Sequence, residues 1–209
     1  AAIIKYYGEE TNLIVPSSID GVPVKEIRKN AFQKNTYLIN VELPNGILSI
    51  GEYAFSNCTS LKSITIPDSV TSIGKYAFEN CTSLESIVLP NGMTTIEQYL
   101  FINCTALKSV TIGENVTAIK TGAFQSCEAL ATIKLPRSVT TLYDGVFSGC
   151  TALNKIFIPK TLTTIYGSPF KKCAINVYCE ALQKPTDWSD NWNQSGTIQY
   201  VFGATEDQM

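Results

Sequence analysis

The sequence predicts an α/β repeat solenoid, a right-handed superhelix in which turns of 23 residues stack on one another. Three observations support this fold class. The same apolar positions recur every 23 residues, β-branched residues alternate along one short segment of each copy, and a phenylalanine recurs at a second fixed place. Spacing this strict indicates that each copy is one turn of a stack with a continuous core.

Three apolar columns define the strand of each copy. The first is Leu38, Leu61, Leu84, Leu107, Leu130 and Leu153; the second is Val41, Ile64, Ile87, Val110, Ile133 and Ile156; the third is Leu43, Ile66, Leu89, Ile112, Leu135 and Ile158. In most copies proline follows the third column and ends the strand, because proline cannot donate a hydrogen bond to the ladder. Strands of successive turns should lie parallel, about 4.8 Å apart, as one continuous sheet.

A second short strand and a turn are expected on the opposite side of each copy. In one copy, Val70 to Ile73 is the extended segment, and Gly74 to Phe78 forms a turn or a single helical turn. The phenylalanine of this turn is expected to fill the interior. Its column runs through Phe55, Phe78, Phe101, Phe124, Phe147 and Phe170.

Both ends of such a stack need caps, because a bare terminal turn would expose the core. Residues 1–30 are predicted to form an N-terminal cap and a first partial repeat, residues 31–175 the repeats, and residues 176–209 a C-terminal cap and tail. Asp20 and Gly21 indicate a tight hairpin turn in the first cap. The residues expected to pack against the core there are Tyr6, Tyr7 and Ile14.

In the C-terminal cap, Trp188 and Trp192 are expected to face inward and close the core. A tryptophan pair can also form a platform for a sugar, and that alternative remains open. The tail from Gly203 to Met209 has no core residue before Met209 and is expected to fray.

The repeat resembles that of a known family. The pattern Cys-x-x-Leu-x-x-Ile-x-Ile-Pro-x-x-Val-x-x-Ile-Gly-x-x-Ala-Phe, from Cys58 to Phe78, is similar to the BspA-type leucine-rich repeat of bacterial surface proteins. The resemblance extends from about Leu13 to Trp192. It implies a leucine-rich-repeat superhelix and a bacterial protein, secreted or at the cell surface, that binds proteins or surfaces, often as an adhesin. The repeated residues are core residues, so the resemblance is specific for the fold and weak for the ligand.

Charge and composition exclude several classes of partner. The 209 residues carry a formal net charge of −2 and no basic block, which argues against nucleic acid and anionic membranes. No apolar run reaches the about 18 to 20 residues that cross a bilayer, and the first residues lack the basic-then-apolar order of a signal peptide. We therefore expect a monomeric fragment that does not insert into membranes and from which the signal peptide and anchor are absent.

Six of the seven cysteines form one column of the repeat. They are Cys58, Cys81, Cys104, Cys127, Cys150 and Cys173. Neighbours in this column should lie about 4.8 Å apart, wider than the about 3.5 to 4.5 Å between the Cβ atoms of a disulfide. We expect buried free thiols, with Cys179 also in the core. A metal site is not expected, since histidine is absent and the cysteines lie on separate turns.

No catalytic constellation is evident in the sequence. Without histidine there is no Ser/His/Asp or Cys/His arrangement to propose. Glu42, Glu85 and Glu97 occupy variable repeat positions, so a glycosidase pair would require chance stacking. Gly51 and Gly74 belong to the repeat and not to a phosphate-binding loop. We predict that the protein is not an enzyme and has no cofactor.

The residues that vary on the outward strand face are the candidates for ligand binding. They are Thr65, Val88, Thr111, Lys134, Lys155 and Phe157. The face changes from small and hydroxylated to basic and aromatic toward its C-terminal end, which makes Lys134, Lys155 and Phe157 the expected ligand end. The predicted function is protein binding or adhesion at the cell surface, to an extracellular matrix or cell-surface ligand.

Two tyrosine columns offer an alternative binding stripe. Tyr53, Tyr76 and Tyr99 occupy one column, and Tyr143 and Tyr166 occupy another. Stacked tyrosines either pack laterally or, when exposed, bind protein or glycan. A glycan-binding module and a structural spacer of a larger surface protein therefore remain as alternative functions.

Three Asn-Cys-Thr motifs match the pattern for N-glycosylation, at Asn57, Asn80 and Asn103. Each is a by-product of the repeat, with its cysteine in the core column. We expect these asparagines to be unmodified.

Overall fold

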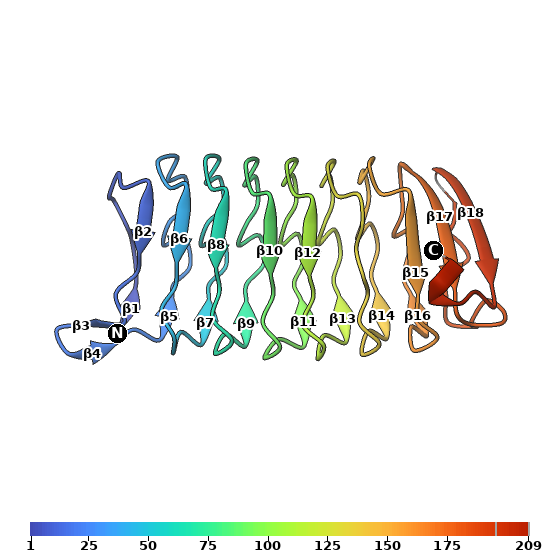
Figure 1. Ribbon diagram of the computed structural model, residues 1–209, viewed down its shortest axis with the longest axis horizontal. Coiled ribbons are helices and arrows are strands. Elements are labelled where there is room, and N and C mark those ends of the chain that lie inside the picture. Colours follow the sequence, from blue (N-terminus) through green and yellow to red (C-terminus); the bar gives the residue numbers. More distant parts are fainter. Residues whose placement is uncertain (195, 209) are drawn as a thin grey trace.

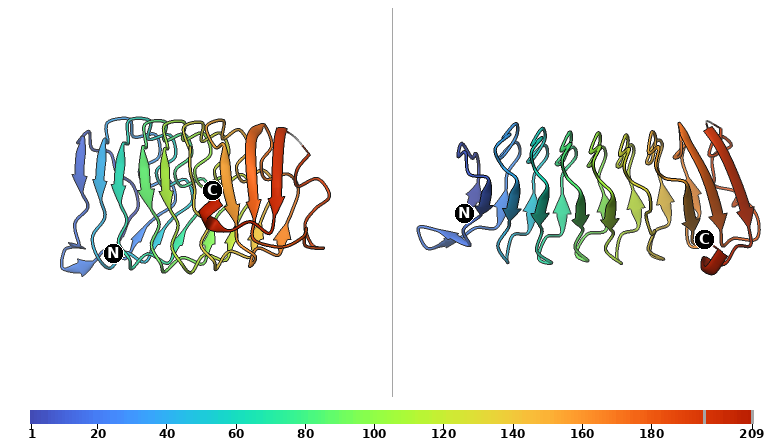
Figure 2. Two further views of the ribbon diagram at one scale, coloured as in Figure 1. Left: turned by 45° about the vertical axis from the view of Figure 1, so that its right-hand side comes forward. Right: turned by 45° about the horizontal axis from the view of Figure 1, so that its top comes forward.

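Each 23-residue copy forms one coil of a nearly straight stack (Figure 1). This computed structural model describes residues 1–194 and 196–208. Ser195 and Met209, which belong to the expected C-terminal cap and tail, lie outside the described residues. Two rows of parallel strands run along the stack, as the views in Figure 2 show, and the row that contains β12 and β15 has no strand in the coil between them.

The row with the longer strands, called the main sheet, contains the strands that the three apolar columns predict. Its strands are β2 (Asn12–Ile14), β6 (Asn40–Glu42), β8 (Ser63–Thr65), β10 (Ser86–Val88), β12 (Ser109–Thr111), β15 (Lys155–Ile158), β17 (Cys173–Cys179) and β18 (Gly196–Phe202). They pair in three blocks, in the orders β2-β6-β8, β10-β12 and β15-β17-β18. In the middle of the stack, equivalent residues of successive repeats pair with each other, so that Val41 pairs with Ile64 and Ile87 with Val110.

The other row, called the minor sheet, is formed by two-residue strands. They are β1 (Ala2–Ile3), β5 (Glu26–Ile27), β7 (Ser49–Ile50), β9 (Ser72–Ile73), β11 (Thr95–Ile96), β13 (Ala118–Ile119), β14 (Thr141–Leu142) and β16 (Thr164–Ile165). From β5 onward, the second residue of each strand points into the core and is buried. This row confirms the second short strand that the sequence predicts.

One phenylalanine from each coil fills the interior between the sheets. Neighbouring rings are stacked nearly parallel, as in Phe78 and Phe101, whose ring centres lie 5.5 Å apart at an angle of 8°. The cysteine column lies beside them, and its six members, together with Cys179, are buried free thiols, as predicted. The thiol of Cys104 donates a hydrogen bond to the carbonyl of Phe78, 3.1 Å away, and the same bond recurs along the column.

The helical turns expected opposite the main sheet do not form, so the fold is a β-solenoid rather than an α/β solenoid. In the described residues the one helix is η1 (Glu206–Gln208), a single 3-10 turn in the tail. The amide of Phe55 donates to the carbonyl of Ala77 on the next coil, at 2.8 Å. Tyr53 and Asn57 have φ angles of 56° and 61°. Residues with left-handed φ angles at this spacing are incompatible with an α-helix. The backbone amides that would form the hydrogen bonds within a helical turn bond to the next coil instead.

The N-terminal segment forms a first coil and a hairpin. Strands β1 and β2 pair in parallel with β5 and β6, so the first residues add one more coil to the stack. The expected hairpin is present as β3 (Ser18–Ile19) and β4 (Val22–Pro23). Tyr6 packs on Phe32, with ring centres 5.2 Å apart. Tyr7 and Ile14 are 85% and 73% exposed and do not contact the core as expected, because β2 directs Ile14 outward beside Glu42.

At the other end, both tryptophans close the core. Trp188 and Trp192 are buried, and their rings meet edge to face with centres 5.0 Å apart. The indole nitrogen of Trp188 donates to the carbonyl of Leu162 at 3.2 Å. These contacts support the capping interpretation.

Candidate functional site

The main sheet presents an exposed strip of side chains at the positions that the sequence predicts. Because side chains alternate along a strand, the residues that flank each core residue point outward. Thr65, Val88 and Thr111 are exposed in this way, and Val88 and Thr111 are direct neighbours in the sheet. This part of the strip is small and largely hydroxylated.

The strip changes character at residues 131–135, where the main sheet is interrupted. Within residues 1–194 and 196–208, no backbone hydrogen bond joins residues 131–135 to the coil on either side, and no strand is present there. Ile133 and Leu135 still point into the core and are buried. The interruption therefore separates β12 from β15 without opening the hydrophobic interior.

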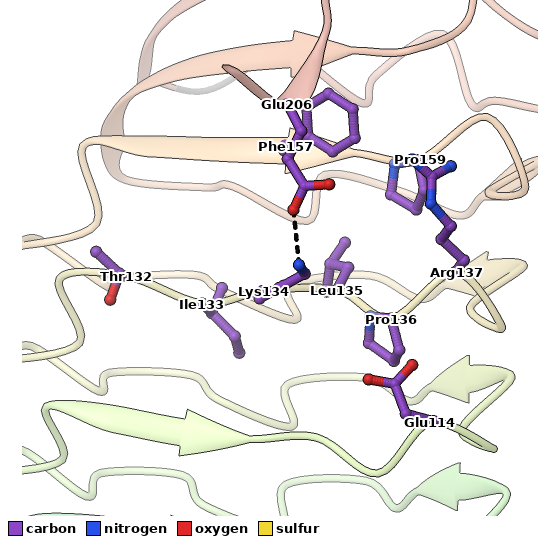
Figure 3. Close-up of a pocket in the computed structure, with 10 residues that line it drawn as sticks. All are labelled: Glu114, Thr132, Ile133, Lys134, Leu135, Pro136, Arg137, Phe157, Pro159 and Glu206. Atoms are coloured by element: carbon purple, nitrogen blue, oxygen red, sulfur yellow. Dashed lines mark ion pairs between the residues drawn. The ribbon is translucent and has the colours of Figure 1, made fainter. Parts of the chain in front are cut away.

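A cavity of about 320 Å³ lies beside this interruption (Figure 3). Its lining residues are Glu114, Thr132, Ile133, Lys134, Leu135, Pro136, Arg137, Phe157, Pro159 and Glu206. The apolar members are buried in the wall, whereas the charged side chains of Glu114, Lys134 and Arg137 are exposed. The arrangement combines an apolar surface with charges of both signs.

Two ion pairs hold the basic side chains at the edge of the cavity. The ammonium nitrogen of Lys134 lies 2.7 Å from a carboxylate oxygen of Glu206, as Figure 3 shows. One guanidinium nitrogen of Arg137 contacts both carboxylate oxygens of Glu180, at 2.8 and 3.0 Å. Both acidic partners come from the C-terminal part of the chain.

The pKa values at this site shift in the directions that these contacts require. The hydrogen bond from Lys134 lowers the pKa of Glu206, and the same contact raises the pKa of Lys134. The amide of Lys160 donates to Glu180 and is the largest cause of its lowered pKa, followed by the contact with Arg137. These shifts favour the charged forms of Lys134, Glu180 and Glu206.

The tail is folded against the last strands rather than frayed as expected. The amides of Gly203 and Ala204 donate to the carbonyls of Ala181 and Cys179, at 2.8 and 2.9 Å. Ala204 is only 3% exposed. Figure 2 shows this C-terminal segment, in red, turned back beside β15. The prediction of a frayed tail is therefore wrong for residues 203–208.

The structure brings together part of the predicted ligand end. Lys134 and Phe157 line the same cavity, whereas Lys155 is half-buried on β15 and is not among its lining residues. Phe157 lies outside the core cluster, as the alternation predicts, but it is only 9% exposed. Thr111 lines an adjacent hollow of about 230 Å³ that also includes Lys134. Thr65 and Val88 lie on more distant strands.

Arg137, Glu180 and Glu206 were not anticipated as members of the site. For Arg137 a signal is present at the repeat position after the proline that ends the strand. This position is acidic in two earlier copies, at Asp68 and Glu114, and basic in two later copies, at Arg137 and Lys160. For Glu206 no comparable signal exists, because the contact depends on how the tail turns back.

The tyrosine columns are packed against themselves. Tyr53, Tyr76 and Tyr99 are half-buried, with ring centres 4.9 and 5.0 Å apart at angles of 7° and 17°. Tyr143 and Tyr166 are tilted, with centres 5.0 Å apart, and Tyr166 is 52% exposed. The faces of the first column are used for mutual stacking, which favours the lateral-packing interpretation.

Metal binding and membrane insertion are two other properties that the side chains and helices of the protein bear on. No group of three or more His, Cys, Asp or Glu side chains in the described ranges is arranged to hold a metal ion. None of the helices in the same part of the chain has the length and apolarity to cross a bilayer.

The coil length, the two parallel sheets and the repeated interior residues define a leucine-rich-repeat scaffold, a class typical of protein interaction modules in bacterial surface proteins. Residues 25–147 and 75–183 match the family described as BspA type leucine rich repeat region, in 6 copies. The chain belongs to this family.

Solved structures of similar proteins agree with this assignment. The chain is 33% identical to a leucine-rich repeat protein of T. pallidum, with a TM-score of 0.69, covering 89% of this chain and 81% of that one. A leucine-rich cell surface protein of Faecalibacterium prausnitzii shares the fold at 20% identity, with a TM-score of 0.50 and coverage of 99% and 91%. A leucine-rich repeat protein of Bacteroides ovatus does so at 24% identity, with a TM-score of 0.51 and coverage of 96% and 65%. No match was found among curated proteins.

Proposed function

We propose that the main sheet binds another protein and that the cavity between residues 131–135 and β15 is the principal contact. The observation that carries this proposal is the coincidence of the cavity with the interruption in the sheet. Apolar walls and a few convergent polar groups are typical of ligand pockets.

The scaffold is suited to this role because its binding positions are fixed by the core. Thr111, Lys134 and Phe157 project from coils that are locked by the stacked interior, so binding would cost little ordering of the receptor. We further propose that the protein acts outside a bacterial cell, in adhesion to a matrix or cell-surface protein. The family membership and the cell surface protein of F. prausnitzii support this setting.

The contacts of the aromatic residues favour protein over glycan as the ligand. Trp188 and Trp192 are buried in the cap and offer no platform to a sugar. The faces of Tyr53, Tyr76 and Tyr99 cover one another.

The proposal is tested by binding of the purified protein to immobilised matrix proteins, mucins and glycans at physiological salt. A saturable protein hit should be weakened on the order of tenfold by Lys134→Ala, which removes a charge from the edge of the cavity. Lys62→Ala is the matched control, because Lys62 is an exposed lysine on a distant coil and should leave binding unchanged. Equal effects of the two substitutions would contradict the cavity as the contact, and a blank panel from folded protein would favour the structural spacer.

A further inference from the structure

One part of the wall of the cavity at Lys134 comes from the C-terminal tail of the same chain. Glu206 is one of its lining residues and places its carboxylate on Lys134, beside Phe157 (Figure 3). The segment that carries Glu206 is held by backbone bonds at Gly203 and Ala204. The tail thus places a short acidic peptide segment at the edge of the cavity.

The part of the tail that reaches the cavity is weakly held. The side chains of Lys134 and Glu206 are 78% and 43% exposed, and an ion pair between exposed groups contributes little to stability. The buried residue of the tail is Ala204, which comes before Glu206 in the chain. Residues 205–208 can therefore leave the cavity without disturbing Trp188 or Trp192.

We infer that residues 203–208 are an internal pseudo-ligand, and that the partner presents an acidic peptide segment whose carboxylate replaces Glu206 on Lys134. This inference rests on the proposed function and names its ligand chemistry. Charge complementarity supports it, since the tail shows directly that the site accepts a carboxylate next to an apolar wall. Displacement of the tail would accompany binding.

The surrounding charges make Lys134 the exchangeable position. Arg137 is engaged by Glu180, and Glu180 is itself fixed by the amide of Lys160 at 2.9 Å. Glu114 lines the cavity as well and would repel a second acidic group placed near it. The site therefore fits a segment with one carboxylate directed at Lys134 rather than a strongly acidic stretch.

The test uses the full chain with Glu206→Gln, which removes the carboxylate that contacts Lys134, keeps the shape of the side chain and leaves Asp207 in place. The probe is a synthetic peptide of residues 203–208, acetylated and amidated at its ends, added in solution and followed by calorimetry or NMR. It should bind the Glu206→Gln protein about two- to fivefold more tightly than the wild type, the range expected for loss of one exposed ion pair. Lys134→Ala introduced into the Glu206→Gln protein, or glutamine in place of glutamate in the peptide, should abolish this gain. Equal or absent binding to both proteins would overturn the inference.

Hydrogen exchange gives a second and independent measurement. Glu206→Gln should speed amide exchange at Gln208, whose amide bonds to Thr205 within the segment that leaves, while Gly203, Ala204 and amides in the middle of β17 keep their protection. Unchanged exchange at Gln208 would contradict the release of residues 205–208 from the cavity. If a protein from the panel depends on Lys134 but binds wild type and Glu206→Gln equally, the pseudo-ligand fails and the proposed function stands. If neither the peptide nor any panel protein depends on Lys134, both fail.

Discussion

Gly122 lies directly against the ring of Tyr99, so closely that a Cβ atom at position 122 would come within 2.5 Å of the ring carbon Cδ1. Gly122 occupies the repeat position that holds Tyr99 in the preceding coil, and its φ of 61° is close to the 54° of Tyr99. The tyrosine column therefore ends where a glycine provides space for the last ring.

Gly122→Ala is expected to destabilise the protein more than the matched change Gly145→Ala. Both positions have left-handed φ angles, of 61° and 64°, and alanine there costs about 1 kcal/mol. At Gly145 the nearest atom is 3.7 Å from the added Cβ, so no further cost arises. At Gly122 overlap with Tyr99 should add about 1 to 3 kcal/mol, the usual cost of overpacking. Urea unfolding followed by circular dichroism measures both, and equal midpoints would contradict the packing argument.

Phe101→Ala should be among the most destabilising single substitutions in the chain. Phe101 has no exposed surface and stacks between Phe78 and Phe124, with ring centres 5.5 Å away on both sides. Its removal leaves a cavity and should cost about 3 to 5 kcal/mol. Val88→Ala is the contrasting control, because Val88 is 63% exposed on the main sheet and its loss should change stability by less than about 0.5 kcal/mol. Thermal unfolding of the two variants checks this difference.

The cysteine column should make the protein lose stability as the pH rises above about 9. Burial raises the pKa of Cys58 and of Cys179 from the ordinary value of 9.0 to about 12. Between these two values the unfolded chain releases the thiol protons while the folded chain keeps them, so the free energy of unfolding falls. Each such thiol contributes about 1.4 kcal/mol per pH unit in this window. Unfolding midpoints at pH 8 to 11 should fall less steeply for Cys58→Ser than for the wild type, and identical slopes would contradict the assignment.

Asn80→Ala should destabilise the protein by about 1 kcal/mol more than Asn80→Gly. Asn80 has a φ of 55°, which glycine adopts freely and alanine does not. Both substitutions remove the same side-chain hydrogen bonds, to Asn57 at 3.0 Å and from Asn103 at 2.9 Å. The difference in stability between the two variants therefore measures the cost of the left-handed backbone conformation. Denaturant midpoints of the two variants measure it. Because the side-chain amide of Asn80 is committed to this ladder, it should also carry no glycan, which intact mass can check.

Most of the fold could be predicted because the same type of residue recurs at each core position in several copies of the repeat. The columns at Leu84, Ile87 and Leu89 recur in each copy, so the strand, its register and its buried face follow from the period. The turn opposite the main sheet could not be assigned, because Gly74 to Phe78 is compatible with either a helical turn or a tight turn. What decides between them is the left-handed φ of Tyr76, 58°, which nothing about a tyrosine signals.

The site could be predicted only in part, because its members depend on the ends of the chain. Alternation along β15 correctly directs Phe157 out of the core, but it cannot reveal that Phe157 has little exposed surface. The pairing of Lys134 with Glu206 joins a repeat position to the tail, and no period relates the two. The sequence does indicate Lys134, because a lysine there breaks the pattern of small residues on the sheet.

The straightness of the stack has a consequence for how such a protein can vary in size. The coils follow one another along a nearly straight axis. Gaining or losing one whole copy on the N-terminal side of the cavity would therefore change the length of the stack, while the coils and the tail that form the cavity stay together. The length of the stack and the binding surface of the cavity can therefore change independently, because duplication of one copy adds one coil.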